Sequence, residues 1–129
     1  MKPRYVVPFF VRYHILRFDF VKGEGRGAAS HYVSLTRLSA RGQIEMNGRR
    51  LAVTGLAWMD HEFSTGGLDP DQVGWDWFGL HLNDGSELML YRMRRADGGA
   101  TPRSSATFVD RQGDAHHVSC DGFAAIPLD

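Results

Sequence analysis

The amino-acid sequence predicts an all-β domain, an antiparallel sandwich or barrel with little helix. Two observations carry this prediction. Runs rich in Val, Leu, Tyr, Trp and Phe alternate with turn signals at short and fairly even spacing, which is typical of an antiparallel meander. No stretch of a dozen residues combines a 3.6-residue apolar period with helix caps. The length of 129 residues is that of one domain.

A tight hairpin is expected near the middle of the chain. Asn47-Gly48 separates strand-like runs at residues 43–46 and 49–59. This dipeptide tolerates the positive φ angles that a type I′ turn requires at both of its central positions. The sequence therefore predicts a two-residue β-hairpin loop at this point.

Three further turns divide the C-terminal half into strands. A glycine in the left-handed region is well suited to close a three-residue hairpin loop. The predicted turns are Asn83-Asp84-Gly85 between strands 73–82 and 87–94, Asp97-Gly98-Gly99 after the second of these strands, and Arg111-Gln112-Gly113 between strands 106–110 and 115–119.

The composition excludes several classes of partner. Fifteen basic and fifteen acidic side chains cancel, so neither nucleic acid nor an anionic membrane surface is expected as a partner. No segment approaches the roughly 20 apolar residues of a membrane span, and we expect a soluble chain. Cys120 is the single cysteine, which excludes an intramolecular disulfide. The sequence specifies neither the compartment nor the oligomeric state.

Neither a metal nor an organic cofactor is expected. The chain has no His-Glu-x-x-His spacing and no thiolate pair. His116 and His117 alternate across a strand, so both cannot face one ion. Gly23-x-Gly25-x-Gly27 lacks the strand and helix that flank a dinucleotide-binding loop.

Strand alternation sorts the side chains of the central region into faces. An unbroken strand over residues 56–63 places Trp58, Asp60 and Glu62 on one face and His61 on the other. Two carboxylates then share a face with an indole ring.

The next two strands show the same separation. Trp75 and Trp77 share one face of their strand, and Asp76 lies on the opposite face. In the following strand, residues 87–94, one face carries Met89, Tyr91 and Met93. Such a face is typical of the lining of a pocket or of a core.

Carboxylates set among aromatic and sulfur-containing side chains allow two interpretations. An ionised carboxylate is costly to bury without a partner, so Asp60 and Glu62 are either paired or protonated. A neutral carboxyl can act as a general acid near neutral pH, and aromatic faces beside it stabilise a developing carbocation. Alternatively, His61 pairs with Asp60 or Asp76 in a structural network and the tryptophans form core. Residue types alone favour the structural interpretation.

Four sequence blocks resemble one known family. They lie at residues 30–38, 55–63, 74–78 and 87–92. In this order, they are similar to blocks of the carotenoid 1,2-hydratase (hydroxyneurosporene synthase) and AttH-type family. The resemblance covers residues 22–129, whereas residues 1–21 depart from the family pattern.

The resemblance implies an architecture. Members of this family resemble two lipocalin-like barrels joined in tandem and are much longer than this chain. Residues 22–129 are therefore expected to form an antiparallel, partial lipocalin-like β-barrel, at the junction of the first barrel and the first part of the second. The chain is then a fragment or a shortened member, and residues 1–21 form a separate N-terminal segment.

The resemblance also implies a reaction: acid-catalysed addition of water to a terminal isoprenoid double bond, without metal or cofactor. In this hypothesis Asp60 is the acid, and His61 or Glu62 tunes it or places the water. The residues that would line or complete the substrate site are Trp58, Trp75, Asp76, Trp77 and Tyr91.

Other functions stay open at this point. A lipocalin-like barrel can be a non-catalytic carrier of an apolar lipid or pigment, and the family also resembles lipocalin-like pericyclic cyclases. A shortened member can also have lost its activity. In the binding and catalytic hypotheses alike, the expected partner is a small apolar molecule, a polyene or a lipid. The position of the Asp60 carboxyl, in a cavity or in a satisfied pair, distinguishes catalysis from carriage.

Overall fold

The computed structural model describes residues 5–6, 15–21, 29–64 and 67–126. Its first sheet contains the short strand β1 (Tyr5–Val6), β2 (Ile15–Val21), the long β3 (Ala29–Met46) and β4 (Arg49–Ser64). β3 lies between β1 and β2 in the order of the sheet, and β4 also pairs with β3. The Gly23-x-Gly25-x-Gly27 segment lies outside the described residues.

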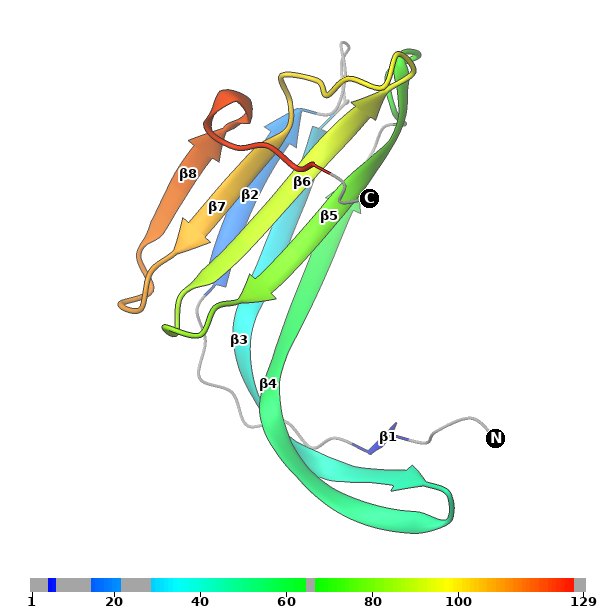
Figure 1. The fold of residues 1–129 in the computed structure, drawn as a ribbon, viewed down its shortest axis with the longest axis vertical. Coiled ribbons are helices and arrows are strands. Elements are labelled where there is room, and N and C mark those ends of the chain that lie inside the picture. Colours follow the sequence, from blue (N-terminus) through cyan, green and yellow to red (C-terminus); the bar gives the residue numbers. More distant parts are fainter. Residues whose placement is uncertain (1–4, 7–14, 22–28, 65–66, 127–129) are drawn as a thin grey trace. The chain divides into compact units, whose positions relative to one another are not determined.

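The second sheet is a meander of four antiparallel strands (Figure 1). The strands are β5 (Gln72–His81), β6 (Glu87–Arg95), β7 (Ser105–Val109) and β8 (Ala115–Ser119), in chain order. A single turn of 3₁₀ helix, Cys120–Gly122, follows β8. The predicted all-β, antiparallel fold class is thus confirmed, as is its likeness to part of a lipocalin-like barrel, and no closed barrel occurs among the described strands.

The backbone confirms the predicted hairpin at Asn47-Gly48. β3 ends at Met46 and β4 begins at Arg49, and the two residues between them have φ angles of 54° and 74°. Asn47 is the one described non-glycine residue with positive φ, a conformation that Asn adopts more readily than most side chains. Both strands are longer than predicted, because β3 already begins at Ala29 and β4 continues to Ser64.

The loop at Asn83-Asp84-Gly85 is also closed as expected. The Leu82 amide donates to the Ser86 carbonyl at 2.9 Å, which leaves three residues in the loop. Gly85 has φ of 90°. The Asp84 carboxylate accepts hydrogen bonds from the Ser86 amide at 3.0 Å and from the Ser86 hydroxyl at 2.6 Å. These side-chain bonds fix the loop from within and so set the register of β5 against β6.

The contacts divide the chain into two compact units. Unit 1 comprises residues 1–16 and 33–61, and unit 2 comprises residues 17–32 and 62–129, including the whole second sheet. The core of unit 2 consists of the buried side chains Met89, Met93, Ala106 and Val109. Unit 1 buries Leu38 together with the small polar side chains of Ser34 and Thr36. Each unit therefore has buried side chains of its own.

The described part of the structure contains no helix with the length and apolar character needed to cross a membrane.

The hairpin between β7 and β8 yields a prediction about pH. The Asp110 carboxylate accepts the amides of Asp114 and Gln112, each at 2.9 Å, and lies 3.3 Å from Nε2 of His116. These bonds, first among them the one from the Asp114 backbone, lower the pKa of Asp110 below its usual value of 3.8. A carboxyl with a lowered folded-state pKa stabilises the fold above its unfolded pKa, and this contribution is lost as the pH falls through the folded value.

We therefore expect Asp110→Ala to lower the urea midpoint of unfolding at neutral pH, and to lower it much less once the pH falls well below 3.8. Asp114→Ala is the matched control, because Asp114 contributes its backbone amide rather than its carboxylate. An equal loss of stability at both pH values would show that Asp110 acts through packing and not through its charge.

Candidate functional site

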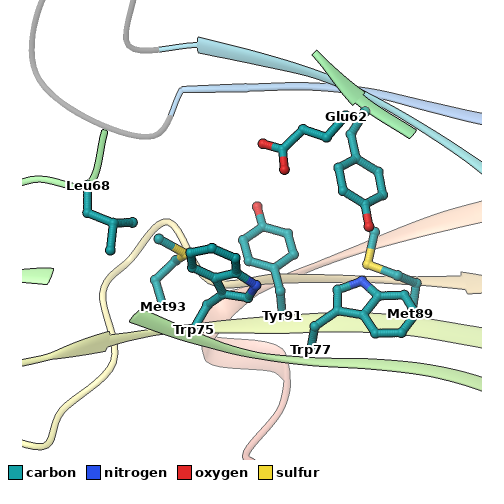
Figure 2. Close-up of a pocket in the computed structure, with 8 residues that line it drawn as sticks. Glu62, Leu68, Trp75, Trp77, Met89, Tyr91 and Met93 are labelled. Atoms are coloured by element: carbon teal, nitrogen blue, oxygen red, sulfur yellow. The ribbon is translucent and has the colours of Figure 1, made fainter. Parts of the chain in front are cut away.

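Unit 2 contains a cavity of about 200 Å³ that is lined mostly by aromatic and apolar side chains (Figure 2). Small-molecule sites in proteins have this character, an apolar wall with a few polar groups. The lining residues are Tyr32, Glu62, Leu68, Trp75, Trp77, Met89, Tyr91 and Met93.

The pairing of β5 with β6 creates the aromatic wall. Trp77 lies opposite Tyr91, and Trp75 lies opposite Met93. Directly paired residues of an antiparallel ladder point to the same face of the sheet. Both indoles therefore lie on the face of β6 that carries Met89, Tyr91 and Met93. Gly79 lies opposite Met89, whose side chain also lines the cavity. Met89, Tyr91 and Met93, which the sequence placed together on a pocket or core face, all line the cavity.

Glu62 is the charged member of the lining. It belongs to the last part of β4 that falls in unit 2, and Figure 2 shows its carboxylate directed toward the phenol of Tyr91. The hydroxyl of Ser30 donates to Glu62 Oε1 at 2.7 Å. Ser30 is only 1% exposed, so the carboxylate is held from behind by a rigid donor.

Tyr91 is the second polar group at the cavity. Burial raises the pKa of its phenol, and a hydrogen bond with the Ser105 hydroxyl partly offsets the increase. The phenol is therefore neutral throughout the physiological pH range. A neutral phenol can donate one hydrogen bond and accept others at the same time.

The predicted acid, Asp60, lies in unit 1. Its Oδ1 atom accepts hydrogen bonds from the Ser34 hydroxyl at 2.5 Å and from the Trp58 indole at 2.7 Å. The bond from Trp58 agrees with the predicted common face of the two residues. His61 follows in the same strand with an exposed side chain. Of the three predicted catalytic residues, Glu62 is the one that lines the cavity of unit 2.

Asp76 is not brought together with the tryptophans beside it in the sequence. Trp75 and Trp77 line the cavity, whereas Asp76 pairs with two arginines of β6. Its carboxylate oxygens lie 3.5 Å from Arg92 Nη1 and 3.4 Å from Arg94 Nε. Arg92 also donates to the carbonyl of Gly98 at 2.9 Å. The structure therefore places Asp76 in an ion-pair cluster on the opposite face of the sheet.

Four lining residues were not among the predicted site residues. Met89 and Met93 had been placed only on a face typical of a pocket or a core, and Tyr32 and Leu68 had not been singled out. Tyr32 lies in the first sequence block, and alternation along β3 alone gave no reason to select it. Leu68 lies between β4 and β5, outside both strands, where no periodicity exists to indicate its direction. Within residues 29–64 and 67–126, no three His, Cys, Asp or Glu side chains are grouped as metal ligands would be.

Comparisons with known proteins agree with this architecture. The AttH-like family model matches residues 20–129. A solved structure from Nitrosomonas europaea, described as an AttH, is 37% identical, with a TM-score of 0.70, over 80% of this chain and 32% of its own. Kievitone hydratase from Nectria haematococca is 20% identical, with a TM-score of 0.57, over 78% of this chain and 31% of its own. At that identity, the second likeness shows the fold alone.

The chain thus spans about a third of the length of both solved structures. No curated protein matches it.

The placement of Asp76 generates a prediction. Asp76→Ala removes the partner of two half-exposed arginines, so we expect a loss of about 0.5–1 kcal/mol in the free energy of unfolding. Because its side chain faces away from the cavity, the affinity for a neutral fluorescent probe such as N-phenylnaphthylamine should change by less than about twofold. Trp77→Ala, on the same strand but in the lining, should weaken probe binding clearly. Equal weakening by both variants would place Asp76 in the site after all.

Proposed function

The chain belongs to the AttH-like family, and from this premise we propose that the cavity of unit 2 binds a small apolar molecule containing a carbon–carbon double bond. We further propose that the bound double bond is hydrated by acid catalysis. Family membership confirms the AttH part of the predicted resemblance. Action on carotenoids remains a prediction.

The observation that carries the proposal is a carboxylate set against an aromatic wall. Glu62 faces Tyr91 across the cavity, and Trp75 and Trp77 line the same space (Figure 2). Protonation of a branched alkene produces a tertiary carbocation. Indole and phenol faces attract a cation through their quadrupoles, and a carboxylate attracts it through its charge. A site built in this way stabilises the cationic transition state more than the neutral substrate.

The reaction requires one acid and one water. The acid transfers a proton to the less substituted alkene carbon, the cation forms at the other carbon, and the oxygen of water attacks it. Loss of a proton from the attached water leaves the alcohol. We assign the acid to Glu62, because its carboxyl lines the cavity. Asp60, the acid predicted from the sequence, is the competing assignment and is tested beside it.

The likeness of fold to a kievitone hydratase supports this proposal, because a similar architecture occurs in an enzyme whose name describes the addition of water. A carrier function has its own support, because seven of the eight lining residues are aromatic, aliphatic or sulfur-containing. Binding without chemical change would favour the carrier.

The first test measures preference for a cation. Choline and 3,3-dimethylbutanol have the same shape, but a charged nitrogen in one replaces a neutral carbon in the other. We expect choline to bind about tenfold more tightly than the alcohol. Binding is measured through the change in fluorescence of Trp75 and Trp77, which line the cavity. Equal affinities, or a preference for the neutral alcohol, would contradict a site built for positive charge.

The second test separates the two carboxyls. Glu62→Gln keeps the shape of the side chain but removes its charge and acidity, so the preference for choline should fall to the part that the aromatic rings supply. With terminally unsaturated isoprenoids or kievitone as trial substrates, hydration appears as a mass gain of one water. We expect Glu62→Gln to lower its rate by at least about a hundredfold. Asp60→Asn is the matched variant, and the reverse pattern would transfer the role of the acid to Asp60.

A further inference from the structure

The cavity of unit 2 has an exposed side and a buried side. Its two tryptophans belong to β5, the strand at one end of the second sheet, and Trp75 is 53% and Trp77 38% exposed. Its two methionines belong to β6, the next strand inward, and Met89 is 2% and Met93 6% exposed. The cavity therefore opens on the side of β5, and the methionines of β6 form its floor.

Strand pairing arranges this part of the lining in rows of two opposed residues. The rows are Trp75 with Met93, Trp77 with Tyr91, and Gly79 with Met89. Glycine has no side chain, so Met89 alone represents the third row in the lining. On its other side Met89 is paired with Thr107 of β7, which is buried. Met89 is thus the part of the floor that borders the interior of unit 2.

The same face of β6 continues beyond Met89 with a buried carboxyl group. Glu87 lies two residues before Met89, so the two side chains share a face, and Glu87 is only 1% exposed. It is paired with His81 of β5. A row of polar groups does not favour an apolar ligand, so the apolar part of the site ends at Met89.

Glu62 lies across the cavity from this floor. Figure 2 shows its carboxylate on the other side of the space from Met89 and Met93, and the residue is exposed. One side of the cavity is therefore charged and accessible to water, and the other is apolar and closed. This contrast orients a ligand that has one polar and one apolar end, with the apolar end against the methionines.

The volume of the cavity limits the part of a ligand that can enter. An engineered apolar cavity of about 150 Å³ in another protein holds benzene, which has six carbons. By the same ratio, the volume of about 200 Å³ holds about eight carbons. The remainder of a longer molecule must stay at the mouth, beside the exposed tryptophans.

We propose that Met89 determines the specificity of the site for ligand length, because its side chain closes the floor of the cavity. The ligand class that fits is a molecule with a short apolar end of about eight carbons, which enters, joined to a part that remains outside. This inference rests on the proposed function in taking this cavity as the binding site. It does not depend on the charge of Glu62 or on the chemical step.

The test measures the affinity of the complete chain for unbranched primary alcohols, from butanol to dodecanol, by calorimetry. Each added methylene that enters the cavity should raise the affinity about fourfold. Beyond about eight carbons, each further methylene should raise it by less than about 1.5-fold, because it stays in water at the mouth.

Variants at Met89 should move this limit. Met89→Ala removes the side chain beyond Cβ, so we expect the limit to rise to about eleven carbons. Met89→Val removes less of the side chain and costs less stability, and it should raise the limit to about nine. Leu90→Ala is the matched control. It removes as many heavy atoms as Met89→Ala from the next residue of β6, but from the opposite face of the sheet, so it should keep the parent limit.

An affinity that rises by the same factor per methylene up to dodecanol in the parent chain would show that the cavity has no floor. A limit that stays the same in Met89→Val and Met89→Ala, or that Leu90→Ala moves equally, would also overturn the role of Met89. If Met89→Ala does not fold, the parent series and Met89→Val decide. A shifted limit without a preference for choline would instead refute the proposed function and leave the role of Met89 intact.

Discussion

The register between β5 and β6 is the constraint on which the site depends. By pairing Trp77 with Tyr91, it places the aromatic rings on one face and leaves Asp76 with Arg92 on the other. A shift of one residue would exchange the two faces completely, because side chains alternate along a strand. The Asp84 bonds that close the intervening loop and the ion pairs on the outer face therefore support the cavity without touching it.

Much of the fold could be predicted because its signals are local. Asn47-Gly48 specifies a turn by backbone conformation alone, and alternation correctly assigned Trp75 to the cavity face and Asp76 to the other. The contribution of Leu68 could not be predicted, because it lies between strands, where no period applies. Alternation also could not decide whether Asp60 or Glu62 lines the cavity, because the two residues share one face of β4. They differ in that Asp60 belongs to unit 1 and Glu62 to unit 2.

The two carboxylates illustrate how position along one strand separates similar groups. Each accepts a hydrogen bond from a serine of β3, Asp60 from Ser34 and Glu62 from Ser30. Asp60 in addition accepts a hydrogen bond from the indole N–H of Trp58. Glu62 instead faces aromatic rings of the second sheet that line the cavity.

The outer ion pairs of β5 have a consequence for how this family can change during evolution. A residue inserted into the loop at Asn83 lengthens a surface connection and leaves both faces of the sheet as they are. A residue inserted within β5 would turn Trp75 outward and force Asp76 into an aromatic interior, away from both of its arginines. Variation in length among descendants should therefore accumulate in the hairpin loops, and the spacing between Trp75 and Trp77 should be inherited unchanged.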